Sequence, residues 1–251
     1  MNQLTAAPLV IKPVRTWWER RQFLHLPWQL HEGDSNWIPP LRRNQKEMVG
    51  YLPHPFYDTA EGQTFLAMRG TQVIGRVMAI VNHAHNKQHN ENIGFFGFFE
   101  CTDDAAAAAG LFDAARAWLK ERGITQVRGP MNPSMNYECG LLIEDYGFQK
   151  VEDMYAFWGH VDMVATMDQK LHFIYDEAVK RFEIKLRRLD RSRFAQEVRM
   201  FLDIYNQSLV GTWGFTPMSE GEIKHAAESM RYLIVPEMTT VAEINGRPVG
   251  A

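Results

Sequence analysis

The sequence contains few cysteines, and this scarcity limits what can hold the fold together. Only Cys101 and Cys139 occur among the 251 residues, and they show neither redox nor metal-site spacing. A disulfide framework needs several cysteine pairs, and disulfides persist mainly in oxidising compartments. We therefore expect a fold stabilised by its apolar core in a reducing compartment, and we predict a cytoplasmic location.

Long apolar runs are also missing. No run approaches the roughly 20 residues that span a bilayer, and residues 1–14 lack the basic and apolar regions of a signal peptide. The formal net charge of −3 predicts no electrostatic footprint for nucleic acid or for an anionic membrane. What is present is a globular composition with 45% hydrophobic residues, which supplies a sizeable core.

Apolar patterning in the first 130 residues predicts an α/β unit. Thr16 and Glu19 form a capping-box pair that opens a helix, and we expect Pro27 to break or kink that helix. After a proline-rich stretch, the pattern predicts a hairpin, a strand, a helix and a strand, at 65–81, 93–99, 105–119 and 124–127. This order is typical of an α/β fold with a mixed sheet.

Beyond residue 165 the pattern predicts helices, and a final hairpin follows them. Apolar residues at helical spacing mark 192–209, and Ser219 with Glu222 forms a second capping box. Asn245-Gly246 lies between the last two apolar runs and is typical of a tight hairpin turn.

The two hairpins resemble each other. Phe65–Val77 and Thr240–Ala251 both run from a strand through a tight loop into an apolar residue and glycine, and helices precede each of them. The repetition predicts a duplicated unit, with an N-terminal domain at 1–160 and the incomplete start of a second, similar domain at 161–251. A chance match between two hairpins is the alternative.

Three strings carry a resemblance to a known family. They are DSNWIPPL at 34–41, GFFGFFEC at 94–101 and RGPMNPSMNYECG at 128–140. On these strings the chain resembles the bacterial family that includes the bacterial ceramide synthases, enzymes similar to GNAT acyltransferases. The resemblance implies two GNAT-like copies, acyl-CoA as co-substrate and an N-acyltransferase reaction. The acceptor it implies is an amine, such as a sphingoid lipid amine.

Two departures from the family pattern limit this inference. The Pro- and Tyr-rich segment that family members carry after the position of Leu142 is missing, and the chain stops at Ala251. Family members continue into a helix with a basic, glycine-rich turn. We therefore expect the acyl-CoA site beyond residue 251 and an inactive or impaired enzyme in this form. A non-catalytic module that binds a ligand or partner, and a remnant without function, are the alternatives.

The turn from Glu100 to Ala105 supports the same expectation on physical grounds. A diphosphate binds at a helix N-terminus through free backbone amides, usually reached through a glycine-rich loop. This turn contains no glycine, and Asp103 and Asp104 stand at the start of the helix. Their carboxylates suit the helix dipole and would repel a diphosphate.

The segment from Arg128 to Gly140 is the predicted site, because it gathers polar side chains after a strand. We assign catalytic roles to Glu138, as a general base, and to Tyr137. The side chains assigned to substrate binding are Arg128, Asn132, Ser134 and Asn136. The alternative is that these side chains only satisfy backbone groups of the turn.

Three further features receive structural interpretations. His83, His85 and His89 lie in a stretch that we expect to be a solvated loop without a metal. The seven basic residues of Lys180–Arg193 are interspersed with acids, so a solvated face is favoured over a peripheral lipid contact. The sheet edge at Val241–Ala251 predicts self-association.

Overall fold

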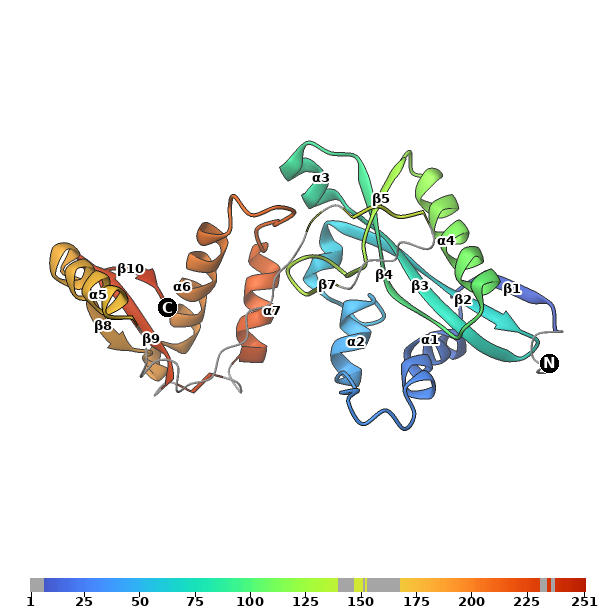
Figure 1. The fold of residues 1–251 in the computed structure, drawn as a ribbon, viewed down its shortest axis with the longest axis horizontal. Coiled ribbons are helices and arrows are strands. Elements are labelled where there is room, and N and C mark those ends of the chain that lie inside the picture. Colours follow the sequence, from blue (N-terminus) through green and yellow to red (C-terminus); the bar gives the residue numbers. More distant parts are fainter. Residues whose placement is uncertain (1–6, 140–146, 151, 153–167, 231–233, 236–237) are drawn as a thin grey trace. The chain divides into compact units, whose positions relative to one another are not determined.

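The computed structural model describes residues 7–139, 147–150, 152, 168–230, 234–235 and 238–251. The chain divides into two compact units (Figure 1). The first contains Met1–Gln149 together with Trp213–Thr216, and the second contains Lys150–Thr212 and Pro217–Ala251.

The first unit contains a five-stranded mixed sheet in the order β1-β2-β3-β4-β5. Only the β4–β5 pair is parallel, and helix α4 connects these two strands. The predicted α/β class and the predicted hairpin, strand, helix and strand are thus confirmed. The element bounds are β1 Leu9–Pro13, α1 Trp17–Leu30, α2 Arg42–Met48, η2 Pro55–Asp58, β2 Ala60–Arg69, β3 Gln72–Asn82, α3 His83–His89, β4 Ile93–Cys101, α4 Ala105–Lys120, β5 Gln126–Arg128, β6 Met131–Asn132 and β7 Glu138–Cys139.

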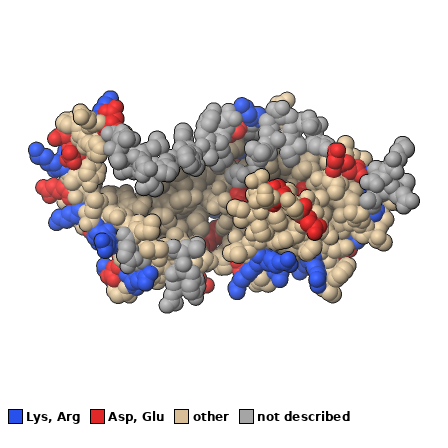
Figure 2. Space-filling view, turned by 60° about the horizontal axis from the view of Figure 1, so that its bottom comes forward, with Lys and Arg blue, Asp and Glu red and all other residues tan. Residues whose placement is uncertain are grey.

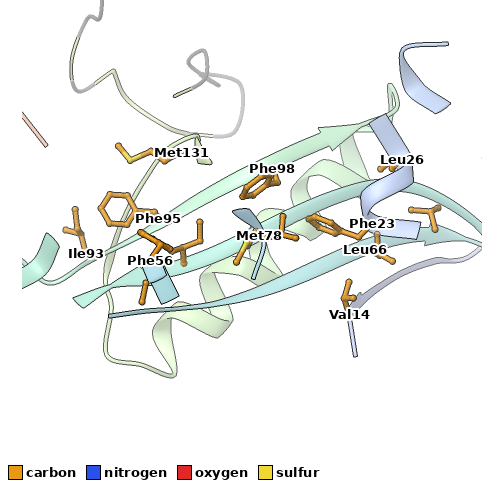
Figure 3. Close-up of a cluster of buried hydrophobic side chains, with 14 residues drawn as sticks. Val14, Phe23, Leu26, Phe56, Leu66, Met78, Ile93, Phe95, Phe98 and Met131 are labelled. Carbon is orange, nitrogen blue, oxygen red and sulfur yellow. The ribbon is translucent and has the colours of Figure 1, made fainter. Parts of the chain in front are cut away.

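Both faces of this sheet are buried. Helix α4 packs its apolar stripe, including Leu111, Phe112 and Leu119, against one face. Helix α1 packs on the other face and supplies Phe23 and Leu26 to a second cluster (Figure 3). Two buried faces explain why the central strands read as nearly continuous apolar runs.

A bulge in β4 changes which face its side chains reach. The register shifts between Arg76 and Met78, and Phe98 adopts a left-handed φ of 51°. Phe95 and Phe98 therefore lie in the same cluster (Figure 3). Phe96 packs instead in the cluster that includes the apolar residues of α4. A regular strand would place residues 95 and 98 on opposite faces.

Of the break or kink expected at Pro27, the break is wrong, because helix α1 continues to Leu30. Proline lacks the amide that would bond the carbonyl of Phe23, four residues earlier. The Nη1 atom of Arg76 instead donates to that carbonyl at 2.8 Å, and Arg76 also pairs with Glu100 at 3.1 Å. A buried arginine from β3 thus replaces the missing helical hydrogen bond.

The second unit contains a three-stranded antiparallel sheet in the order β10-β9-β8. Its elements are α5 Gln169–Phe182, β8 Lys185–Arg188, η5 Arg191–Arg193, α6 Phe194–Ser208, α7 Glu220–Met230, β9 Thr240–Ile244 and β10 Arg247–Gly250. Val198, Leu202 and Ile223 form the buried cluster between α6 and α7. The hairpin predicted around Asn245-Gly246 is confirmed, and both residues have positive φ.

Strand β8 corrects the expectation that this region is helical until the final hairpin. Arg187 of β8 donates to Glu243 at 2.6 Å and to Glu197 at 2.8 Å, so part of the basic run is paired within the unit. In the second unit, strand β8 is followed by helices α6 and α7 and then by the β9–β10 hairpin. In the first unit, strand β1 is followed by helices α1 and α2 and then by the β2–β3 hairpin. Strand β8 pairs antiparallel with β9, as β1 pairs with β2. A shared order is what a duplicated unit predicts.

Candidate functional site

The predicted site segment lies beside the bulge of β4, in the first unit. Strand β5 pairs with the beginning of β4, and the short strands β6 and β7 pair with each other. At Gly97 an added Cβ would lie 1.8 Å from the backbone oxygen of Met131. Only glycine allows this approach, so the second and third strings of the sequence pack directly against each other.

Asn132 connects the bulge to the predicted general base. Its Oδ1 accepts the Phe98 backbone amide at 2.6 Å, and its Nδ2 donates to the Glu138 carboxylate at 3.3 Å. The amide of Phe98 is freed by the bulge, since a left-handed residue leaves the regular ladder. Asn132 therefore satisfies a backbone amide, which is the structural role given above as the alternative to substrate binding. The same side chain also orients Glu138.

Glu138 is exposed at the start of β7, whereas Tyr137 is half-buried. The Tyr137 ring lies edge-on to His54 and Phe56, with centroid distances of 5.7 and 6.1 Å. An exposed carboxylate held by one amide can accept a proton from an incoming amine. Among the predicted site residues Glu138 carries the carboxylate, and its role as general base stays a prediction.

Arg128 takes part in a network that the sequence did not suggest. Its Nη1 and Nη2 atoms donate to the Glu91 carboxylate at 2.9 and 2.8 Å. Glu91 also bonds His85 Nε2 at 3.1 Å, and His85 Nδ1 lies 3.2 Å from the Thr216 hydroxyl. The Arg128 guanidinium is therefore paired with Glu91, and its role in substrate binding stays a prediction.

The expectation of a solvated histidine loop is wrong for His85. Residues His83–His89 form helix α3, and His85 is buried, with 3% of its surface exposed. Burial lowers the pKa of His85, which favours the neutral ring. Burial alone would raise the pKa of Glu91, but the hydrogen bonds from Arg128 and His85 outweigh it and lower that pKa.

Ser134 and Asn136 make bonds within the first unit. Ser134 Oγ accepts the Asn136 amide at 3.3 Å, and Asn136 Nδ2 donates to the Thr216 carbonyl at 2.8 Å. Asn136 Oδ1 is buried and has no hydrogen-bond partner within the described residues. The adjoining cavity of about 10 Å³ is the size of a single water molecule. These two side chains are positioned to organise the turn.

The entrance of helix α4 is occupied by the protein's own carboxylate. Asp104 Oδ1 accepts the Ala107 amide at 3.0 Å, and Arg69 Nε donates to Asp104 Oδ2 at 2.6 Å. The Arg69 guanidinium is the main cause that lowers the pKa of Asp104. The Thr102 amide is bonded as well, to the Ile74 carbonyl at 2.8 Å. A diphosphate would therefore meet a fixed negative charge here.

Neither a metal-binding cluster nor a membrane-spanning helix occurs among the residues that the structure describes. Within those residues, no cluster of three or more His, Cys, Asp or Glu side chains is arranged to hold a metal ion. Among the described helices, none combines the length and apolar character needed to cross a bilayer.

Two curated proteins are similar to the chain over most of its length. It is 33% identical to the bacterial ceramide synthase of Caulobacter vibrioides (strain NA1000 / CB15N), with 98% of the chain and 69% of that protein aligned. It is 30% identical to protein YghO of Escherichia coli (strain K12), covering 91% of the chain and 63% of that protein. The chain thus spans about two thirds of each relative. No family model matches it.

Solved structures with a similar arrangement include acetyltransferases. An aminoglycoside acetyltransferase from an uncultured soil metagenomic sample, in complex with sisomicin, is 11% identical and has a TM-score of 0.41, over 61% of this chain and 96% of that one. A tandem GNAT protein from the clavulanic acid biosynthesis pathway is 13% identical and has a TM-score of 0.35, over 49% of this chain and 39% of that one.

Proposed function

The chain belongs to the family of the bacterial ceramide synthase, and from this premise we propose that it serves N-acyl transfer from acyl-CoA to an amine. The 33% identity over 98% of the chain carries this proposal. The acceptor class that follows from the relative's name is a sphingoid-like lipid amine. The confirmed family resemblance and the confirmed α/β class with a mixed sheet agree with it.

The proposed chemistry requires one proton acceptor. The amine nitrogen attacks the thioester carbonyl carbon only in its neutral form, and the C–S bond then breaks to release CoA. Glu138 takes the proton from the ammonium group, and its exposed carboxylate is oriented by Asn132 at 3.3 Å. Tyr137, packed beside His54, forms a wall of the same site.

The other predicted residues act as positioning groups in this proposal. Arg128 is fixed by Glu91, and Asn136 by the Thr216 carbonyl, so neither is free to bind substrate. Ser134 holds the turn that precedes Tyr137. Together they keep Glu138 at a fixed distance from the bulge of β4.

The acyl-CoA diphosphate is not expected at the entrance of α4. Asp104 already occupies the helix N-terminus and is held there by Arg69. In this proposal the first unit binds the acceptor and supplies the base, whereas the CoA moiety is held elsewhere. We therefore expect the first unit alone to bind CoA weakly and to transfer acyl groups poorly.

A non-catalytic binding module is the second candidate, and one observation favours it. Hydrogen bonds within the first unit hold five of the predicted site side chains, namely Arg128, Asn132, Ser134, Asn136 and Glu138. A site built for rigidity is also what a ligand-binding domain needs. The two candidates differ in whether Glu138 participates in turnover.

Amine-dependent release of CoA from palmitoyl-CoA tests the proposal. With sphinganine as the amine, Glu138→Gln is expected to lower kcat by about 10²–10⁴-fold, and Glu138→Asp is expected to restore part of it. Glu228→Gln, an exposed carboxylate of the second unit, is the matched control. Measurable CoA release at equal rates in Glu138→Gln and the control would refute the role of Glu138. Binding of sphinganine without any release of CoA would favour the module.

A further inference from the structure

Helices α1 and α2 form an open pocket on the first unit that no step above uses. Its volume is about 450 Å³. The apolar and aromatic lining consists of Trp17, Leu24, Trp28, Tyr51 and Leu52, and the polar lining consists of Arg20, Arg21, His25, Arg42, Gln45 and Lys46. The lining contains four cations and no carboxylate. Figure 2 shows Lys and Arg side chains gathered along the lower edge of this unit.

The four cations of this pocket are available to an external anion. Within the described residues none of them makes a salt bridge, and the two acids of α1 and α2 pair with other cations. Glu19 bonds Lys12 at 2.9 Å, and Glu47 bonds Arg43 at 3.0 Å. The arginines are held over aromatic rings instead, for example Arg42 at 4.9 Å from the Trp28 centroid. Such contacts orient a guanidinium and leave its charge unneutralised.

Large apolar side chains surround the same pocket and stand in solvent. Ile38 is 87% exposed, Leu41 78%, Trp17 72% and Trp18 52%. Two ring contacts lie in or beside this set: the centroids of Trp17 and Trp18 are 5.5 Å apart, and those of Trp28 and Trp37 are 5.5 Å apart. A soluble face rarely exposes so many large apolar groups together.

We propose that this face, the α1–α2 surface, docks onto an anionic lipid bilayer. Exposed tryptophans and aliphatic side chains enter the interfacial region, and the pocket cations bind lipid phosphate groups. Charge complementarity selects this occupant, because the surface carries free cations on a chain whose net charge is −3. The buried Oε1 of Gln45, which has no partner within the described residues, offers an acceptor for a headgroup hydroxyl. The inference does not depend on the proposed acyl transfer.

Vesicle sedimentation with the full chain tests the proposal. Vesicles of phosphatidylcholine with about one third phosphatidylglycerol should bind the chain, whereas pure phosphatidylcholine vesicles should bind it at least tenfold more weakly. Raising the salt concentration should release the chain, because screening weakens the cation–phosphate attraction. No binding to anionic vesicles would overturn the proposal. Binding of inorganic phosphate without vesicle binding would also overturn it.

Matched variants locate the contact. Arg21→Ser with Lys46→Ser removes two pocket cations, and Lys87→Ser with Lys120→Ser removes two exposed cations from α3 and α4. Both double variants change the net charge equally, but only the first should weaken anionic vesicle binding, by more than about tenfold. The double variant Ile38→Ser with Leu41→Ser should bind anionic vesicles more weakly. Its binding should keep the same dependence on salt concentration, because the pocket cations are unchanged. Equal losses in the first two variants would refute docking through the α1–α2 surface. Circular dichroism melts check that each variant folds.

Discussion

The guanidinium of Arg76 donates a hydrogen bond of 2.8 Å to the backbone carbonyl of Phe23. That carbonyl lacks a helical partner because Pro27 has no amide. Helix α1, which forms one side of the α1–α2 surface, therefore depends on a side chain from strand β3. Arg76 is 3% exposed and also pairs with Glu100.

Replacing Arg76 should destabilise the first unit in a way that position 27 can partly correct. Arg76→Met leaves the Phe23 carbonyl and Glu100 without their partner, and we expect a loss of about 3 kcal/mol in the free energy of unfolding. Adding Pro27→Ala supplies a new amide at position 27, which should recover about 1 kcal/mol. Urea unfolding measures both values. Strict additivity of the two substitutions would contradict the proposed link between them.

The pairing of Arg128 with Glu91 gives a second prediction. Lysine cannot reproduce two parallel hydrogen bonds, so Arg128→Lys should lower the free energy of unfolding by about 1.5 kcal/mol. The control is Arg116→Lys, in an exposed pair with Asp113, which should change stability by less than about 0.5 kcal/mol. If Arg128 instead contacted substrate, Arg128→Lys would raise KM and leave stability unchanged.

Acid should weaken the start of helix α1 through Glu19. Its carboxylate accepts the backbone amides of Thr16 and Arg15 and pairs with Lys12, and these contacts hold the pKa of Glu19 at about 2. Since the folded pKa lies below the unfolded value of 4.5, this contribution is complete above pH 4.5 and is lost as the pH falls towards 2. Urea unfolding at several pH values should show a weaker acid dependence for Glu19→Gln. An unchanged dependence would contradict this assignment.

Much of the first unit follows from local patterning alone. Alternation, turn residues and helical spacing predict β2, β3, β4 and α4, and the capping boxes at Thr16 and Ser219 are both formed. The unexpected features depend on distant contacts. Helix α1 continues past Pro27 because Arg76, which lies 49 residues further along the chain, donates a hydrogen bond to the Phe23 carbonyl. Strand β8 forms because its residues pair with β9.

The sequence locates the candidate site as a segment, but it does not reveal which distant residues contact the side chains of that segment. Arg128 follows a strand and reads as a ligand contact, and only the fold brings Glu91, 37 residues away, within 2.8 Å. Trp213–Thr216 joins the first unit although its sequence position suggests the second. His85 contacts Thr216 across 131 residues, and no local signal reports such a pair.

Hydrogen exchange at the entrance of α4 tests the central claim most directly. The account holds that Asp104 and Arg69 exclude the CoA diphosphate from this helix terminus. Mass spectrometry measures hydrogen exchange of the amides of Ala105–Ala108, and these amides should exchange at the same rate with and without palmitoyl-CoA. The variant Asp104→Asn should keep the Kd for palmitoyl-CoA within about twofold of the unsubstituted chain. Slower exchange of these amides in the presence of palmitoyl-CoA would contradict the account.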